Sequence, residues 1–111
     1  MFEKNLNVGY LLDFYGELLP ERKQSVLNAY YNEDYSLAEI AVDLGISRQG
    51  VRNIIKTAEA DLFFYEEKLG LAKKLMQVEA HADSLLQLMK DTELPQSIAD
   101  EILLLTQVVK E

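Results

Sequence analysis

The sequence predicts an all-α protein with a tri-helical helix-turn-helix core followed by long amphipathic C-terminal helices. Three observations support this prediction. Apolar residues recur at the three- and four-residue spacing of a helix face over most of the chain. The chain contains no alternating run rich in Val, Ile and Thr, and no hairpin dipeptide. A serine–x–x–glutamate motif and a glycine also mark the two ends of a short helix in the middle of the sequence.

Length and composition indicate one domain, or a small domain with an appendage. The chain has 111 residues, of which 49% are hydrophobic, too many for a disordered protein. No apolar run approaches the roughly 18 residues of a membrane span. The first ten residues lack the basic start and apolar block of a signal peptide. Without cysteine, no disulfide or thiolate metal site is available. We therefore expect a cytoplasmic protein with no membrane span.

The formal net charge of -8 is unevenly distributed. Residues 1–35 carry a net charge of -3 and residues 57–111 carry -6, whereas residues 36–56 carry +1. An acidic protein does not coat nucleic acid by bulk electrostatics, because non-specific binding of that kind requires a basic surface. Any nucleic-acid contact is therefore expected to be local to the middle segment.

Two helices are predicted before that segment. The first covers about residues 6–18, and its apolar stripe comprises Leu11, Phe14, Tyr15 and Leu18. Pro20 suits the first turn of the second helix, where its missing N–H is no loss. The apolar face of this second helix comprises Val26, Leu27, Tyr30 and Tyr31.

A helix-turn-helix motif is predicted at residues 36–56. Ser36 and Glu39 form a capping box at the start of its first helix, about 37–43. Gly45 suits a left-handed cap at the end of that helix, and Ser47 caps the second helix. The expected interface between the two helices comprises Ile40, Ala41, Leu44, Ile46, Val51 and Ile54. The second helix extends to about residue 69 along the stripe Val51, Ile55, Ala58, Leu62, Tyr65 and Leu69.

The outward face of the second helix is the candidate nucleic-acid-binding site. Its residues are Ser47, Arg48, Gln49, Arg52, Asn53 and Lys56. In DNA-binding helix-turn-helix proteins this helix enters the major groove by its N-terminal end. Arg reads guanine and Gln or Asn reads adenine, while a serine-capped helix start holds phosphate. The same unit also serves as a packing module or binds protein or RNA, so the motif does not fix the function. Gly50, in the first turn, either lets a partner approach closely or marks a tolerant position.

Two further helices are predicted after Gly70. The first follows a stripe of Leu71, Leu75, Val78, Ala82, Leu85 and Met89. Gly70 either ends the preceding helix or lies within it, and both interpretations stay open. The apolar face of the last helix comprises Ile98, Ile102, Leu105 and Val109, widened by Leu103, Leu104 and Val108. The stripe is short for a coiled coil. We therefore divide the chain into a helix-turn-helix domain (1–69) and an extension (70–111) that packs on this domain or forms a homodimer.

Other candidate sites are weaker. His81 has Glu79 and Asp83 nearby, but a metal site needs further ligands from another element, so we expect a surface histidine. Glu66 and Glu67 are adjacent and point about 100° apart on a helix, unlike a paired-carboxylate site. No phosphate loop or nucleophile–base pair is visible. We expect no catalytic residue, no metal and no cofactor, and therefore no enzyme.

Residues 19–62 resemble region 4 of bacterial sigma factors, the helix-turn-helix that reads the −35 promoter element. Nearly the whole chain is similar to YlxM-type proteins, small helical proteins of Gram-positive bacteria. The stretches that carry this resemblance are LLDFYGELL, YNEDYSLAEIA, LGISRQ and FFYEEKLGL. Gly50 departs from the family pattern, which has a small non-glycine residue there. Members are usually encoded beside the gene for the signal recognition particle GTPase, so the resemblance implies a role in that protein-targeting pathway or in its regulation.

Three functions follow as alternatives. The first is a regulatory protein of the signal recognition particle pathway that binds DNA, RNA or particle components through the outward face. The second is a sequence-specific DNA-binding regulator that forms a homodimer through the C-terminal helices. The third is a protein-interaction module whose acidic C-terminal half, including the acidic residues between Glu59 and Glu67, binds a basic partner such as the RNA-binding domain of the particle's GTPase or its complex with RNA.

Overall fold

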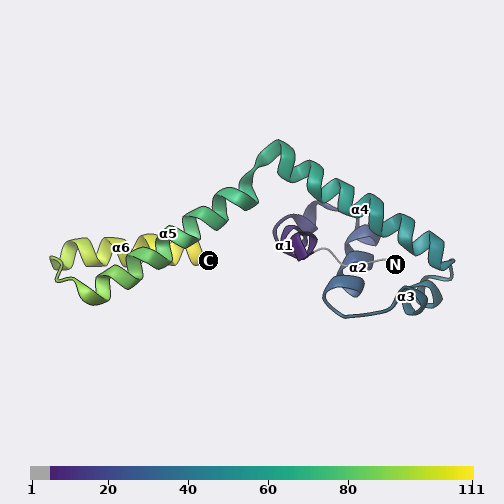
Figure 1. The fold of residues 1–111 in the computed structure, drawn as a ribbon, viewed down its shortest axis with the longest axis horizontal. Coiled ribbons are helices and arrows are strands. Elements are labelled where there is room, and N and C mark those ends of the chain that lie inside the picture. The colour runs from purple at the N-terminus through teal and green to yellow at the C-terminus, as the bar shows by residue number, and fades with distance from the viewer. Residues whose placement is uncertain (1–5) are drawn as a thin grey trace. The chain divides into compact units, whose positions relative to one another are not determined.

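The structure, a computed structural model, describes residues 6–111 and is helical almost throughout (Figure 1). The prediction that the chain does not begin with a signal peptide concerns its first ten residues, and residues 1–5 lie outside the described part. Within the described residues six α-helices occur in the order α1 (Leu6–Tyr15), α2 (Glu21–Tyr31), α3 (Leu37–Leu44), α4 (Arg48–Leu69), α5 (Leu71–Asp91) and α6 (Gln96–Lys110). A 3₁₀ turn, η1 (Gly16–Leu18), follows α1. No strand occurs in the part of the chain described, which confirms the all-α prediction.

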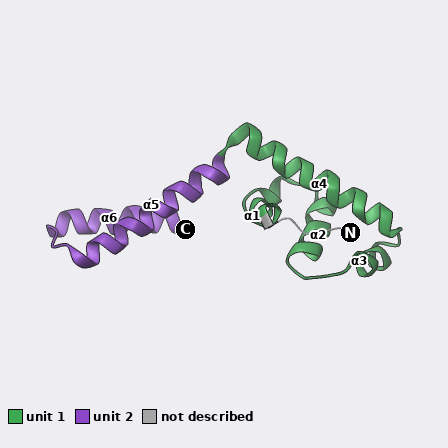
Figure 2. Ribbon diagram, in the orientation of Figure 1, with its two compact units in different colours: residues 1–70 green, residues 71–111 purple. Residues whose placement is uncertain are grey.

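The chain forms two compact units, residues 1–70 and residues 71–111 (Figure 2). In the first unit, α4 packs against α1, α2 and α3 and forms the spine of the core. The fully buried side chains come from three of these helices and include Val8, Leu27, Val51, Ile55 and Leu62. Four-residue and three-residue spacing places Val51, Ile55, Ala58 and Leu62 on one side of α4, as the sequence predicts.

Two apolar residues of the first unit lie elsewhere than predicted. Leu18 remains 58% exposed, because the α-helix ends at Tyr15 and the tighter 3₁₀ turn rotates Leu18 off the stripe. Leu44 remains 37% exposed and does not plug the crossing of α3 and α4. Ile40 and Ala41 of α3 are buried, as predicted, and α3 packs against α4, on which Val51 is buried.

Gly70 separates α4 from α5. Its φ of 62° is in the left-handed region, and its N–H donates to the carbonyl of Glu66. The helix therefore does not continue unbroken through this position. Leu69, the last residue of the predicted stripe, is 52% exposed at this end of α4.

The second unit is an antiparallel hairpin of α5 and α6. An ion pair joins the C-terminal end of α6 to α5, with Lys110 Nζ 2.6 Å from Asp83 Oδ1. The hydrogen bond to this carboxylate raises the pKa of Lys110 above its ordinary value of 10.5. The two predicted stripes do not become a buried core, since Val78, Ile98 and Leu105 remain exposed. Two helices alone cannot enclose both apolar faces.

Candidate nucleic-acid interface

The turn between α3 and α4 is defined by local hydrogen bonds. The Ser36 hydroxyl accepts from the N–H of Glu39, whose carboxylate accepts from the N–H of Ser36, so the predicted capping box is present. Gly45 adopts a φ of 68°, the left-handed conformation that favours glycine. The Ser47 hydroxyl then accepts from the N–H of Gly50 at 3.0 Å and caps α4. The helix-turn-helix is thus specified by its own caps.

The six residues of the candidate site lie together at the start of α4, Ser47 as its N-cap and the other five in its first three turns. We call them the α4 ribbon: Ser47, Arg48, Gln49, Arg52, Asn53 and Lys56. All are exposed except Arg52, which is half-buried. Arg48, Arg52 and Lys56 follow one another at intervals of four residues, so their positive charges lie along one side of the helix. A ligand with spaced negative charges, such as a phosphate backbone, matches this arrangement.

Hydrogen bonds join the side chains at the centre of the ribbon. The Gln49 amide donates to Asn53 Oδ1 at 3.1 Å, and an Arg52 guanidinium N–H donates to Gln49 Oε1 at 3.4 Å. Gln49 therefore connects the cation at one side to the amide at the other. An amide and a guanidinium held side by side offer the groups that read adenine and guanine in the major groove.

Gly50 lies beneath this ribbon, in the first turn of α4. A Cβ at this position would meet Ile46 Cδ1 and Ser47 Oγ at 3.4 Å each, which is ordinary van der Waals contact. Its backbone conformation is helical and does not require glycine. The structure therefore gives no steric reason for glycine within the protein itself.

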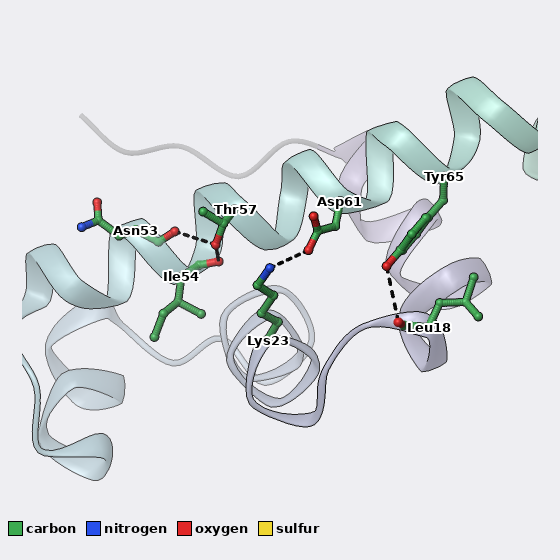
Figure 3. Close-up of polar contacts among 7 residues, drawn as sticks. All are labelled: Leu18, Lys23, Asn53, Ile54, Thr57, Asp61 and Tyr65. Carbon is green, nitrogen blue, oxygen red and sulfur yellow. Dashed lines mark hydrogen bonds and ion pairs between the residues drawn. The ribbon is translucent and has the colours of Figure 1, made fainter.

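Polar contacts anchor α4 to the N-terminal helices along the part of α4 that follows the ribbon. Lys23 Nζ of α2 lies 2.7 Å from Asp61 Oδ2, and the Tyr65 hydroxyl donates to the carbonyl of Leu18 at 3.4 Å (Figure 3). Within α4 itself, the Thr57 hydroxyl donates to the carbonyls of Asn53 and Ile54. These contacts, with the buried face of the helix, hold the ribbon on a rigid element.

The carboxylates of α4 take part in the same anchoring. The Tyr31 hydroxyl donates to Glu59, and the Tyr15 hydroxyl donates to Glu66 at 2.6 Å. With Asp61 bound by Lys23, three acidic residues of the segment from Glu59 to Glu67 have internal structural contacts. The sequence offered a basic partner for this acidic segment as one of three alternatives and did not predict these long-range pairs, for which no sequence pattern exists.

The carboxylates of α3 restrict where a polyanion can bind. In DNA-binding versions of the motif the first helix crosses the nucleic-acid backbone. Here α3 has no Lys or Arg, and its charged residues, Glu39 and Asp43, are exposed. Phosphate contact is therefore favoured at α4 and disfavoured along the exposed face of α3.

No metal centre is found in residues 6–111, where no group of three or more His, Cys, Asp or Glu side chains is placed to hold an ion. His81 of α5 is exposed, as expected. Within the described helices, none is both long enough and apolar enough to cross a lipid bilayer.

A family model described as "Putative helix-turn-helix protein, YlxM / p13 like" matches residues 2–106. The chain belongs to this family, UPF0122. A UPF0122 protein of Listeria innocua is 43% identical over 103 residues, or 92% of this chain and 94% of the relative. One from Acetivibrio thermocellus is 42% identical over 106 residues, or 96% of this chain and 91% of the relative. One from Caldanaerobacter subterraneus is 56% identical over 64 residues, covering 58% of this chain and 55% of the relative.

The family match confirms the resemblance to YlxM-type proteins, and the caps and turn of α3 and α4 agree with its description as helix-turn-helix. A UPF0122 chain thus has the element that binds nucleic acid in other helix-turn-helix proteins. The narrower resemblance to sigma region 4 stays a prediction.

Proposed function

We propose that this chain is a non-enzymatic regulatory protein of the cytoplasm that binds nucleic acid, DNA or RNA, through the α4 ribbon. The observation that supports this most is the position of the exposed Arg48, Gln49 and Asn53 at the N-terminal end of an anchored recognition helix. These residues also lie in the segment of positive net charge in an otherwise acidic chain. Binding is therefore local, and the acidic remainder limits non-specific attachment.

The proposed mechanism assigns different tasks to the charged and the amide side chains. Arg48 and Lys56 contact phosphates, and the N-terminus of α4 contributes its partial positive charge. Gln49 and Asn53 contact base edges, with Arg52 held beside them. The phosphate contacts fix position and the amide contacts give sequence preference.

We further propose that the protein acts in the signal recognition particle pathway or regulates it, by binding nucleic acid or particle components. This part rests on the family resemblance. Residues 1–69 are the helix-turn-helix domain, and residues 70–111 are the extension that joins two copies in a homodimer. Nucleic-acid binding is assigned to the α4 ribbon and dimerisation to the extension, so the two activities can be tested with separate variants.

A sequence-specific DNA-binding regulator is the second candidate. The hydrogen-bonded pair of Gln49 and Asn53 favours it, because amide side chains read adenine in the major groove of DNA. The narrow, deep major groove of an RNA helix does not admit such contacts. Selection of preferred sequences from a random duplex DNA pool tests this candidate. A sequence-specific DNA-binding regulator should enrich a common site.

Capture of partners from a cell extract, with and without nuclease, tests the pathway assignment. We expect recovery of particle components without nuclease and their loss after nuclease treatment, if RNA connects them. Arg48→Glu should abolish capture, and Arg22→Glu is its matched control. Both arginines are exposed in the first turn of a helix, where glutamate interacts favourably with the helix dipole, so neither change should unfold the protein. Failure to recover any particle component would contradict the pathway assignment.

A further inference from the structure

The hairpin of α5 and α6 buries no large apolar side chain. Its buried residues are Ala72, Ala82 and Thr106, whereas the first unit fully buries side chains as large as Leu27 and Ile55. Burial of large apolar side chains contributes most of the stability of a small domain. Forty or so residues without such a core rarely fold alone and usually require a partner surface.

The uncovered apolar side chains gather on one broad face of the hairpin. On α6, helical spacing places Leu104, Leu105 and Val108 next to one another, and they are 56%, 55% and 66% exposed. On α5, Val78 and Leu88 are 39% and 61% exposed on the side that continues this face. We call these five residues the hairpin face. Beside Leu88 is an apolar groove of about 250 Å³, lined by Leu85, Leu88, Met89, Thr92, Leu94 and Ile102.

The two helices differ in length, which leaves the start of α5 uncovered by α6. At 1.5 Å per residue, the 21 residues of α5 span about 32 Å and the 15 residues of α6 about 22 Å. The difference of about 10 Å corresponds to about six residues, so roughly the first two turns of α5 extend beyond α6.

Charge is divided between the two ends of the hairpin. The start of α5, residues 71–78, has Lys73 and Lys74 and no acidic residue, a net charge of +2. The loop end, residues 90–101, has one lysine and four acidic residues, a net charge of -3. Two hairpins stacked in opposite directions place each acidic loop end over the basic start of the other. Stacked in the same direction, they would place like charges together, which is unfavourable.

From the uncovered apolar face and the charge division we infer that the hairpin face binds the same face of a second copy, as an antiparallel four-helix bundle with two-fold symmetry. This inference rests on the homodimer of the proposed function and specifies its surface and direction. A two-fold axis makes the contacts reciprocal, so the loop end of each copy covers the first turns of α5 in the other. The hairpin faces together form the apolar core that one hairpin lacks.

Sedimentation of the full chain tests the interface. We expect the wild-type protein to have twice the 12.7 kDa mass of the chain. Leu104→Glu should halve that mass, because it replaces a leucine of the hairpin face with a second charge next to Glu101. Gln107→Glu adds the same charge at an exposed position of α6 outside this face, and it should leave the dimer intact. A wild-type monomer, or a Leu104→Glu dimer as stable as the wild type, would overturn the inference.

The direction of packing has its own measurement. Because the chain has no cysteine, Thr92→Cys allows a single spin label at the loop end of each hairpin. Thr92 is about ten residues from the centre of α5, so an antiparallel dimer places the two labels roughly 30 Å apart by helix rise. Two labels side by side would contradict the antiparallel arrangement. The label and Leu104→Glu leave the α4 ribbon unchanged, so nucleic-acid binding by these variants distinguishes a wrong interface from a wrong function.

Discussion

Tyr15 and Glu66 are joined by a hydrogen bond of 2.6 Å between the phenol hydroxyl and a carboxylate oxygen, although 51 positions separate them in sequence. Tyr15 is buried at the end of α1, and Glu66 belongs to the last turns of α4. The bond therefore joins the first helix of the domain to the helix that carries the ribbon. It is one of several contacts that fix the direction of α4.

We expect Tyr15→Phe to lower the free energy of unfolding by about 1–2 kcal/mol, because it removes a buried donor to a charged acceptor and leaves the ring in place. Tyr35→Phe is the matched control, since Tyr35 is exposed and should change stability by less than about 0.5 kcal/mol. Urea denaturation of the two variants measures the difference. Equal stabilities would show that the bond to Glu66 contributes nothing.

Gly50→Ala should raise the free energy of unfolding by up to about 1 kcal/mol, because alanine is the better helix former and its Cβ fits. Gly45→Ala should have the opposite effect and cost roughly 1–2 kcal/mol, because Gly45 has a left-handed φ of 68°. Thermal unfolding measures both. If Gly50→Ala also weakens nucleic-acid binding, the glycine is there to admit the ligand. A loss of stability in Gly50→Ala would instead show that the first turn of α4 is more tightly packed.

Gln49→Ala should reduce discrimination between preferred and random sequences by about 1–3 kcal/mol, because Gln49 positions Asn53 and Arg52. Its affinity for random sequence and its salt dependence should not change, since an amide carries no charge. Gln107→Ala, at an exposed position of α6, is the control. Competition binding with specific and random duplexes measures this. An equal loss of affinity for the specific and the random duplex would show that Gln49 supports the structure or contacts phosphate and does not give sequence preference.

Ser47→Ala should cost about 1 kcal/mol of stability, because it removes the acceptor that caps α4 at the N–H of Gly50. Fraying of that turn should also weaken nucleic-acid binding, since the ribbon begins there. Ser97→Ala, in the first turn of α6, is a control whose side chain is exposed. Hydrogen exchange at the first turn of α4 reports the fraying directly. Unchanged exchange at that turn would mean that the cap contributes little.

The helix-turn-helix could be predicted closely from the sequence because its determinants are local. Ser36, Glu39, Gly45 and Ser47 act within three or four residues of themselves, so the limits of α3 and the start of α4 follow from the caps. The six residues of the ribbon follow from helical spacing on α4 in the same way. Whether they bind nucleic acid is not a property of spacing and stays a proposal.

Features that depend on distant residues could not be predicted. The pairs of Lys23 with Asp61 and Tyr15 with Glu66 join helices far apart in the chain and have no sequence pattern. The stripes of α5 and α6 predicted an apolar face but not its exposure, because exposure depends on what lies opposite. Leu18 was misplaced because the change from α to 3₁₀ geometry at Gly16 has no clear sequence mark.

The salt dependence of nucleic-acid affinity for purified protein tests the central claim most directly. With Arg48 and Lys56 contacting phosphates of duplex DNA, the logarithm of the association constant should fall with the logarithm of salt concentration with a slope near −2 per ribbon, about −0.9 for each phosphate. Arg52→Glu should abolish measurable binding, and Arg22→Glu should leave both affinity and slope unchanged. Wild-type binding with no salt dependence, or equal affinity for Arg52→Glu and Arg22→Glu, would contradict the assignment of the α4 ribbon as the nucleic-acid-binding surface.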